Sequence, residues 1–186
     1  VAARIADAAH VAGIRVMDAP VSGGETGAIE GTLSIMVGAN PADFDEVKPV
    51  LDAMGTTVIL VGPPGSGQTV KAANQLIVAG TLELVAEAIV FLRAYGVDTE
   101  AAVDVLSGGL AGSRILERKA ATMLAGNFQP GFRIDLHHKD MGIVTTAARE
   151  RDVAATSADR DDQQRRRDQG HAGPVAPGPP GGADHE

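Results

Sequence analysis

The chain has 186 residues, a formal net charge of −8 and no cysteine, and 44% of its residues are hydrophobic. The lack of cysteine excludes disulfides and thiolate metal sites, and an acidic chain without a long basic run is a poor partner for nucleic acid, which needs clustered lysine and arginine. The apolar fraction is ample for a buried core. We therefore expect a cytoplasmic protein that binds neither nucleic acid nor a membrane.

The first part of the chain alternates helix and strand patterns. Gly13 should end the first helix, and Asn40 is a good N-cap for the second. The predicted elements are helices over residues 2–12 and 41–54 and strands over residues 14–18, 33–38 and 57–61. Such alternation is typical of an α/β sheet.

The middle of the chain has an almost entirely helical pattern. The predicted helices cover residues 68–95, 99–106, 113–124 and 134–150. The first of these is apolar almost all round, so we expect it to be buried on most faces. It contains Glu83 and Glu87, which favours a helix of a soluble protein over a membrane span.

The last 36 residues, 151–186, have a different composition. Val153 and Val175 are their only large apolar residues, and a block of charged residues leads into a run rich in proline and glycine. Such a segment cannot offset the entropy of ordering itself, so we predict that it is disordered. Two interpretations stay open: a natural flexible tail, or a shift of the reading frame near Glu150.

The first candidate site is the sequence DAPVSGG at residues 18–24, where a predicted strand enters a glycine-rich loop. Ser22 offers a hydroxyl, and Gly23 and Gly24 allow backbone amides to approach an anion closely. The loop could therefore hold a substrate carboxylate. The alternative is an ordinary turn.

The second candidate site is the sequence GSGQTVKAANQ at residues 65–75. Lys71 and Asn74, three residues apart, lie on one face of the predicted helix. An ammonium and an amide beside a reacting oxygen could supply the proton and the hydrogen bond that a forming alkoxide needs. The alternative is a surface lysine. A phosphate-binding loop is excluded, because the GK[ST] ending is missing.

Two further motifs are weaker by themselves. His137 and His138 are adjacent and point in different directions on a helix, which argues against a metal site there. Taken alone, Lys139 next to Asp140 indicates only a solvated helix face. Ser113 could cap a helix or, with the arginine that follows it, face a ligand.

In chain order, the patterns DAPVSGG, GxGxxxKxxN and FxxxLxxKD resemble the β-hydroxyacid dehydrogenase family over residues 1–150. Within that family the stretches GAIEGTLSIMVG, GGLAGSRILE and PGFRIDLHHKD are most similar to the tartronate semialdehyde (2-hydroxy-3-oxopropionate) reductases. The 3-hydroxyisobutyrate dehydrogenases are the alternative.

The resemblance implies an α/β remnant of a Rossmann-like domain over residues 1–64. An all-α domain similar to the C-terminal domain of 6-phosphogluconate dehydrogenase would follow over residues 65–150, and the tail would cover residues 151–186. It also implies NAD or NADP as cofactor, a small semialdehyde or 3-hydroxy acid as substrate, no metal, and a homo-oligomer.

The resemblance assigns roles to individual residues as well. Ser22, Gly23 and Gly24 would hold the substrate carboxylate, Lys71 would be the general acid–base residue and Asn74 would hydrogen-bond the substrate. The same resemblance places two further residues near the nicotinamide and the closed cleft, Phe132 and Lys139.

The sequence departs from the family at its start. Full-length members begin with a strand–GxGxxG–helix unit that binds the pyrophosphate, and this chain contains none. We therefore expect an N-terminally truncated chain whose cofactor binding and activity are impaired. A non-catalytic fragment that acts only as a helical association module is the alternative from a different functional class.

Overall fold

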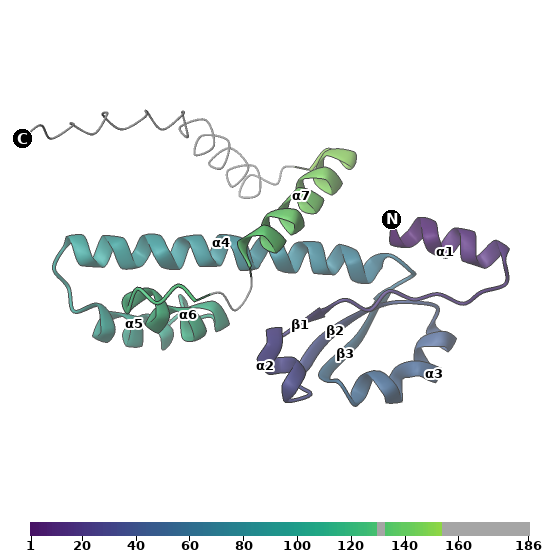
Figure 1. Ribbon diagram of the computed structural model, residues 1–186, viewed down its shortest axis with the longest axis horizontal. Coiled ribbons are helices and arrows are strands. Elements are labelled where there is room, and N and C mark those ends of the chain that lie inside the picture. The colour runs from purple at the N-terminus through teal and green to yellow at the C-terminus, as the bar shows by residue number, and fades with distance from the viewer. Residues whose placement is uncertain (130–132, 154–186) are drawn as a thin grey trace, which may run out of the picture.

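The computed structural model describes residues 1–129 and 133–153. Within these residues a small sheet with its helices is followed by a helical region, as predicted (Figure 1). The helices are α1 (Ala2–Val11), α2 (Gly24–Ile29), α3 (Pro41–Asp52), α4 (Ser66–Ala94), α5 (Thr99–Ser107), α6 (Arg114–Leu124) and α7 (Ile134–Glu150), and the strands are β1 (Val21–Ser22), β2 (Leu33–Gly38) and β3 (Gly55–Gly62).

The sheet has the order β1-β2-β3, with β2 at its centre. β1 pairs with β2 in the antiparallel direction, and β2 pairs with β3 in parallel through the α3 crossover. The apolar run of β2 makes it the buried strand, and Ile35 and Val37 are almost inaccessible. Phe44 and Leu51 of α3 pack against these side chains and complete the core of the sheet region.

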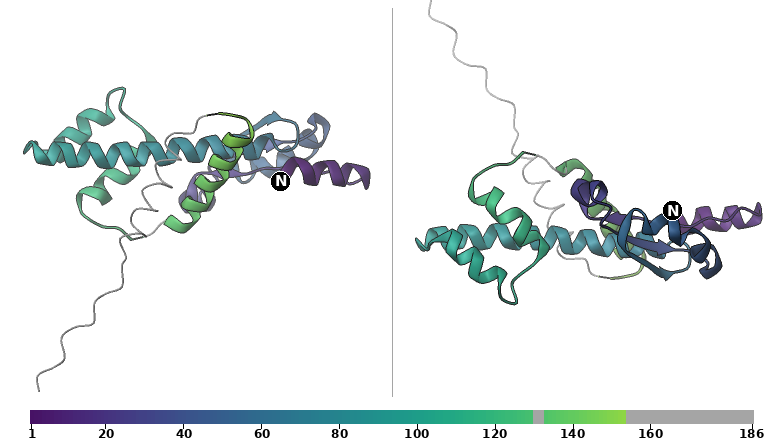
Figure 2. Two further views of the ribbon diagram at one scale, coloured as in Figure 1. Left: turned by 90° about the horizontal axis from the view of Figure 1, so that it is seen from above. Right: turned by 90° about the horizontal axis from the view of Figure 1, so that it is seen from below.

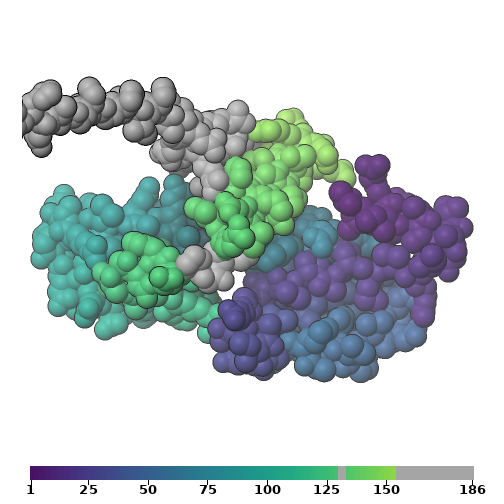
Figure 3. All heavy atoms as spheres, in the orientation of Figure 1, coloured from purple at the N-terminus to yellow at the C-terminus, as the bar shows by residue number. Residues whose placement is uncertain are grey.

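α4 is the spine of the molecule and joins the sheet to the helical region (Figures 1 and 2). Near the C-terminal end of α4, Val85 and Ile89 form a second core with Leu116 and Ala120 of α6. α7 crosses the first half of α4 (Figure 1), and on the face that Figure 3 shows it lies between the helical region and α1. There its buried side chains pack on Ala72, Leu76 and Ala79.

One predicted strand is wrong. Residues 14–18 form no strand, and their backbone pairs with the sheet only at Asp18, which bridges to Gly38. A strand needs a hydrogen-bonded neighbour along its length, and no described strand pairs with residues 14–17. The glycine-rich loop was also more regular than expected, because it contains β1 and α2.

The prediction that α4 is buried on most faces is also wrong. Among its residues only Gly67, Gln75, Val85 and Ile89 are buried. Its apolar pattern satisfies the length and composition of a membrane span, with a mean hydropathy of 1.9 over a window that is 17% buried. A core helix of a soluble protein meets the same criterion, so this feature decides nothing about location.

Smaller differences concern helix ends and the tail. Asn40 is the N-cap of α3, but its side chain accepts no capping hydrogen bond, and α3 ends at Asp52 rather than at residue 54. Gly13 takes a φ of 70° just after α1, as expected for a helix-ending glycine. The predicted disordered tail lies outside the described residues from position 154 onward.

Candidate active site

The predicted carboxylate-binding loop lies where β1 ends and α2 begins. Ser22 pairs with Ser34 of β2, and the next two residues, Gly23 and Gly24, have φ angles of 136° and 66°. Side chains other than hydrogen rarely allow these angles. A Cβ on Gly23 would also lie 3.1 Å from the Leu33 side chain. The turn therefore requires glycine for its shape, and anion binding by it stays a prediction.

Lys71 extends from the second turn of α4 to this loop. Its Nζ donates a hydrogen bond to the carbonyl oxygen of Val21, at 2.8 Å, and Val21 immediately precedes Ser22. Burial lowers the pKa of Lys71 below its ordinary value of 10.5, and the Asp140 carboxylate raises it. The fold thus brings a partly desolvated ammonium to the loop across 50 residues of sequence, as a proton donor requires.

Asn74 belongs to a chain of hydrogen bonds that joins α4 to α7. Its Nδ2 donates to Oε1 of Gln75 at 2.8 Å, and Nε2 of Gln75 donates to Oδ2 of Asp140 at 2.7 Å. Gln75 is only 7% exposed. The Asp140 carboxylate also pairs with the Lys139 ammonium at 3.2 Å. An amide and a carboxylate whose partners are set in this way can orient the groups around Lys71.

Sequence reasoning missed Gln75 and assigned no role to Asp140. Spacing was the available signal for Gln75. It lies four positions after Lys71, so it shares a helix face with Lys71 just as Asn74 does. Lys139, predicted to lie near the nicotinamide, has a largely exposed side chain paired with its neighbour. Phe132, the other predicted cofactor contact, lies outside the described residues.

Arg118 also reaches the loop, from α6. Its Nη1 lies 3.4 Å from the carbonyl oxygen of Gly23 and donates a long hydrogen bond to it. Sequence analysis did not single out this arginine, because nothing in a helical pattern indicates which distant loop a surface side chain meets. Ser113, by contrast, caps α6 by accepting a hydrogen bond from the Leu116 amide at 3.1 Å. The capping interpretation of that motif is therefore confirmed.

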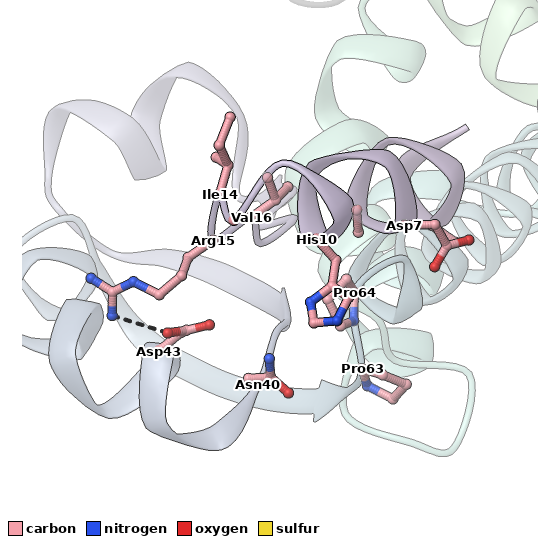
Figure 4. A pocket seen from close by; sticks show the side chains of 12 residues that line it. Asp7, His10, Ile14, Arg15, Val16, Asn40, Asp43, Pro63 and Pro64 are labelled. Carbon is pink, nitrogen blue, oxygen red and sulfur yellow. Dashed lines mark hydrogen bonds and ion pairs between the residues drawn. The ribbon is translucent and has the colours of Figure 1, made fainter.

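A cavity of about 500 Å³ lies elsewhere, between α1, the segment after it, the start of α3 and the loop after β3 (Figure 4). Arg15 and Asp43 point toward one another at its edge and form an ion pair of 3.0 Å. His10 and Asn40 also line it. None of the predicted site residues lines this cavity, so it is separate from the candidate active site.

The first turn of α4 does not fit the pyrophosphate of a dinucleotide. The glycine-rich turn before α4 is the obvious place to test, because helix N-termini bind phosphate. There the amides of Gly65 and Gln68 already donate to the carboxylate of Asp18. A carboxylate in that position would repel a phosphate.

Comparison with known proteins identifies the family. The sequence model "NAD-binding of NADP-dependent 3-hydroxyisobutyrate dehydrogenase" matches residues 65–172, and "NAD binding domain of 6-phosphogluconate dehydrogenase" matches residues 1–62. The 2-hydroxy-3-oxopropionate reductase of Escherichia coli is 50% identical over 133 residues, which are 72% of this chain and 46% of that protein.

Solved structures agree. The 3-hydroxyisobutyrate dehydrogenase of Mycobacterium tuberculosis, solved with L-serine, matches with a TM-score of 0.78 and 27% identity, over 91% of this chain and 61% of that one. A structure of Psf3 in complex with NADP+ and 2-OPP matches with a TM-score of 0.71 and 27% identity, over 85% of this chain and 57% of that one.

The chain spans about half the length of the curated relatives it matches. The first family model alone nevertheless covers more than half of this sequence, and both models describe domains that bind nicotinamide dinucleotides. The cofactor class of the family is therefore NAD or NADP. The chain belongs to the 3-hydroxyisobutyrate dehydrogenase-like family of NAD(P)-dependent hydroxyacid dehydrogenases.

Proposed function

We propose that this chain carries the substrate-binding and proton-transfer part of a reductase that converts tartronate semialdehyde to glycerate. The observation that carries the proposal is the contact between the Lys71 ammonium and the Val21 carbonyl, at the entrance to the Ser22–Gly23–Gly24 turn. The similarity to the reductase of Escherichia coli supports the choice of substrate.

In this reaction a bound nicotinamide cofactor supplies a hydride to the aldehyde carbon. The turn at Ser22, Gly23 and Gly24 would hold the substrate carboxylate, with the aldehyde directed toward α4. Lys71 would protonate the alkoxide as it forms, and its lowered pKa makes that transfer easier. Asn74 has a second amide hydrogen beyond the one it gives to Gln75, and this hydrogen would bind the substrate hydroxyl.

The test joins this chain to the dinucleotide-binding half of the reductase from Escherichia coli and measures reduction of tartronate semialdehyde. Lys71→Ala should lower kcat roughly 1000-fold, because general acid catalysis contributes on that scale. Lys48→Ala is the matched control, since Lys48 lies on α3 and pairs with the exposed Asp52. Near-normal turnover by the Lys71 variant would refute the role.

We further propose that this chain alone binds NADH and NADPH no more tightly than millimolar. The reasons are the missing GxGxxG unit and the carboxylate at the N-terminus of α4. Calorimetric titration of the purified chain measures this directly, and micromolar binding would contradict it.

The proposal includes the domain division predicted from the sequence, at residues 1–64, 65–150 and 151–186. It also includes the predicted cytoplasmic location.

The substrate has one alternative within the same class. A 3-hydroxyisobutyrate dehydrogenase would oxidise a branched 3-hydroxy acid or reduce its semialdehyde in the same site. The ratio of kcat/KM for tartronate semialdehyde and methylmalonate semialdehyde in the fused enzyme separates the two. A ratio in favour of the second compound would replace our substrate and leave the role of Lys71 intact.

An association role is favoured by one specific observation. Apolar side chains that recur every seven residues along α4 are exposed, which is the spacing of a seam between helices. They are Val70, Ile77, Leu84 and Phe91. We propose that the protein is a homo-oligomer that covers this seam. Sedimentation analysis should show a species larger than the monomer, and Ile77→Glu should shift it toward the monomer.

A further inference from the structure

Asp18 joins the loop that carries the carboxylate-binding turn to the helix that carries Lys71. Its backbone pairs in both directions with Gly38, the last residue of β2, at 3.0 and 2.7 Å. Its carboxylate faces α4. Oδ1 accepts a hydrogen bond from the amide of Gly65, and Oδ2 accepts one from the amide of Gln68 at 2.7 Å. One residue therefore holds the end of the central strand and the first turn of α4 together.

The space around this carboxylate leaves little freedom. A Cβ on Gly38 would lie 2.3 Å from Oδ1 of Asp18, and a Cβ on Gly67 would lie 2.8 Å from Oδ2 and 2.3 Å from the backbone oxygen of Met36. Only glycine fits at both positions. The helix thus meets the strand backbone to backbone, and the carboxylate fills the remaining gap.

The contact between Lys71 and the loop depends on this joint from both sides. Lys71 lies three residues after Gln68, and its acceptor Val21 lies three residues after Asp18. Both arms are short, since three residues of helix rise about 4.5 Å and three residues of extended chain span at most about 10 Å. A shift at Asp18 therefore moves the ammonium relative to the turn.

We propose that Asp18 is a positioning residue that sets the distance between the Lys71 ammonium and the Ser22–Gly23–Gly24 turn by clamping the first turn of α4. This inference rests on the proposed function and deepens it. Within the described part of the chain, the Asp18 carboxylate accepts hydrogen bonds from the amides of Gly65 and Gln68 and not from the ammonium, so its effect passes through Lys71.

The variant Asp18→Asn tests the clamp with almost no change of size. The two hydrogen bonds use different oxygens, and an amide has only one acceptor oxygen, so the variant must lose one of them. The matched control is Asp98→Ala, because Asp98 caps α5 by accepting the amides of Glu100 and Ala101 and lies outside the site. Both variants lose helix capping, and only the first disturbs Lys71.

The readout is the titration of Lys71 in the purified chain, followed by NMR after labelling the lysine amines with ¹³C-methyl groups. Lys71→Arg assigns the signal. We expect the pKa of Lys71 to rise toward its ordinary value in Asp18→Asn, because the ammonium leaves the loop and becomes solvated. Loss of the Asp18 charge alone would lower that pKa, so the direction separates positioning from a field effect. Asp98→Ala should leave the titration unchanged.

An unchanged or lowered pKa of Lys71 in Asp18→Asn, with a loss of stability like that of Asp98→Ala, would overturn the proposal. In the fused enzyme we expect a kcat roughly 100-fold lower for Asp18→Asn with KM little changed, as misplacement of a catalytic group produces. The titration needs no substrate. If it shifts as expected while the unsubstituted enzyme shows no turnover, the proposed function fails and the positioning by Asp18 stands.

Discussion

The first half of α4, residues 66–80, and its second half, residues 81–94, are held in place by different interactions. The first half meets the sheet through the Asp18 carboxylate. It meets α7 through the bond between Gln75 and Asp140 and through a small apolar contact around Leu76. The second half is held mainly by apolar side chains, with Val85 and Ile89 packed between α5 and α6. One continuous helix thus has a polar joint at one end and an apolar core at the other.

This difference shows how one part of a helix can position a side chain while another part stabilises the fold. Hydrogen bonds are directional and fix distances to tenths of an ångström, so they suit the half that presents Lys71. Apolar burial is not directional, so it contributes free energy to the second half without fixing one geometry. Substitutions in the two halves should therefore differ in kind as well as in size.

The largest expected effect is at the joint. Gly67→Ala should lower the free energy of unfolding by about 4 kcal/mol or more, because its Cβ would meet backbone oxygen of β2 that cannot move aside. Gly80→Ala is the matched control in the same helix, with open space around it, and should stabilise by about 0.5–1 kcal/mol. Urea denaturation of both variants measures the difference. Equal effects would show that the close contact between Gly67 and β2 does not matter for stability.

The next effect is in the apolar half. Ile89 is 4% exposed, and Ile89→Ala should cost about 3 kcal/mol through the cavity it leaves. Its neighbour Val90 is 67% exposed, so Val90→Ala should change stability by less than about 0.5 kcal/mol. The titration of Lys71 should be unaffected in both. A shift of that titration in Ile89→Ala would mean that the two halves are coupled.

The smallest expected effect is the pH dependence that Lys71, in the first half of α4, gives to the stability of the chain. Burial lowers the pKa of Lys71 in the folded chain, so the unfolded chain binds more protons between that pKa and 10.5. The free energy of unfolding should gain a rising contribution from Lys71 as pH increases through this window. Lys71→Met should remove that rise, and Lys48→Met, at an exposed lysine, should keep it. Urea unfolding at a series of alkaline pH values decides between these outcomes.

Much of the site could be predicted from local sequence. Ser22, Gly23, Gly24 and Lys71 were selected by residue type and spacing, and the structure brings the turn and the lysine together. Asn74 was chosen by the same spacing argument, which could not rank it against Gln75. Arg118 and Asp18 were beyond reach, because their partners are 95 and 47 to 50 residues away and no local pattern records such contacts.

Periodicity in the sequence alone determined most element positions, because backbone hydrogen bonding and side-chain period are local properties. The bounds of β2 and α7 and the second end of α6 agree with the prediction to the residue. Tertiary structure decided the rest. It left residues 14–17 without a strand partner, exposed an apolar face of α4 that composition had indicated as buried, and placed an aspartate under the helix that carries Lys71. Such outcomes depend on which distant segments meet, and the free energy of a contact is realised only when both partners are present.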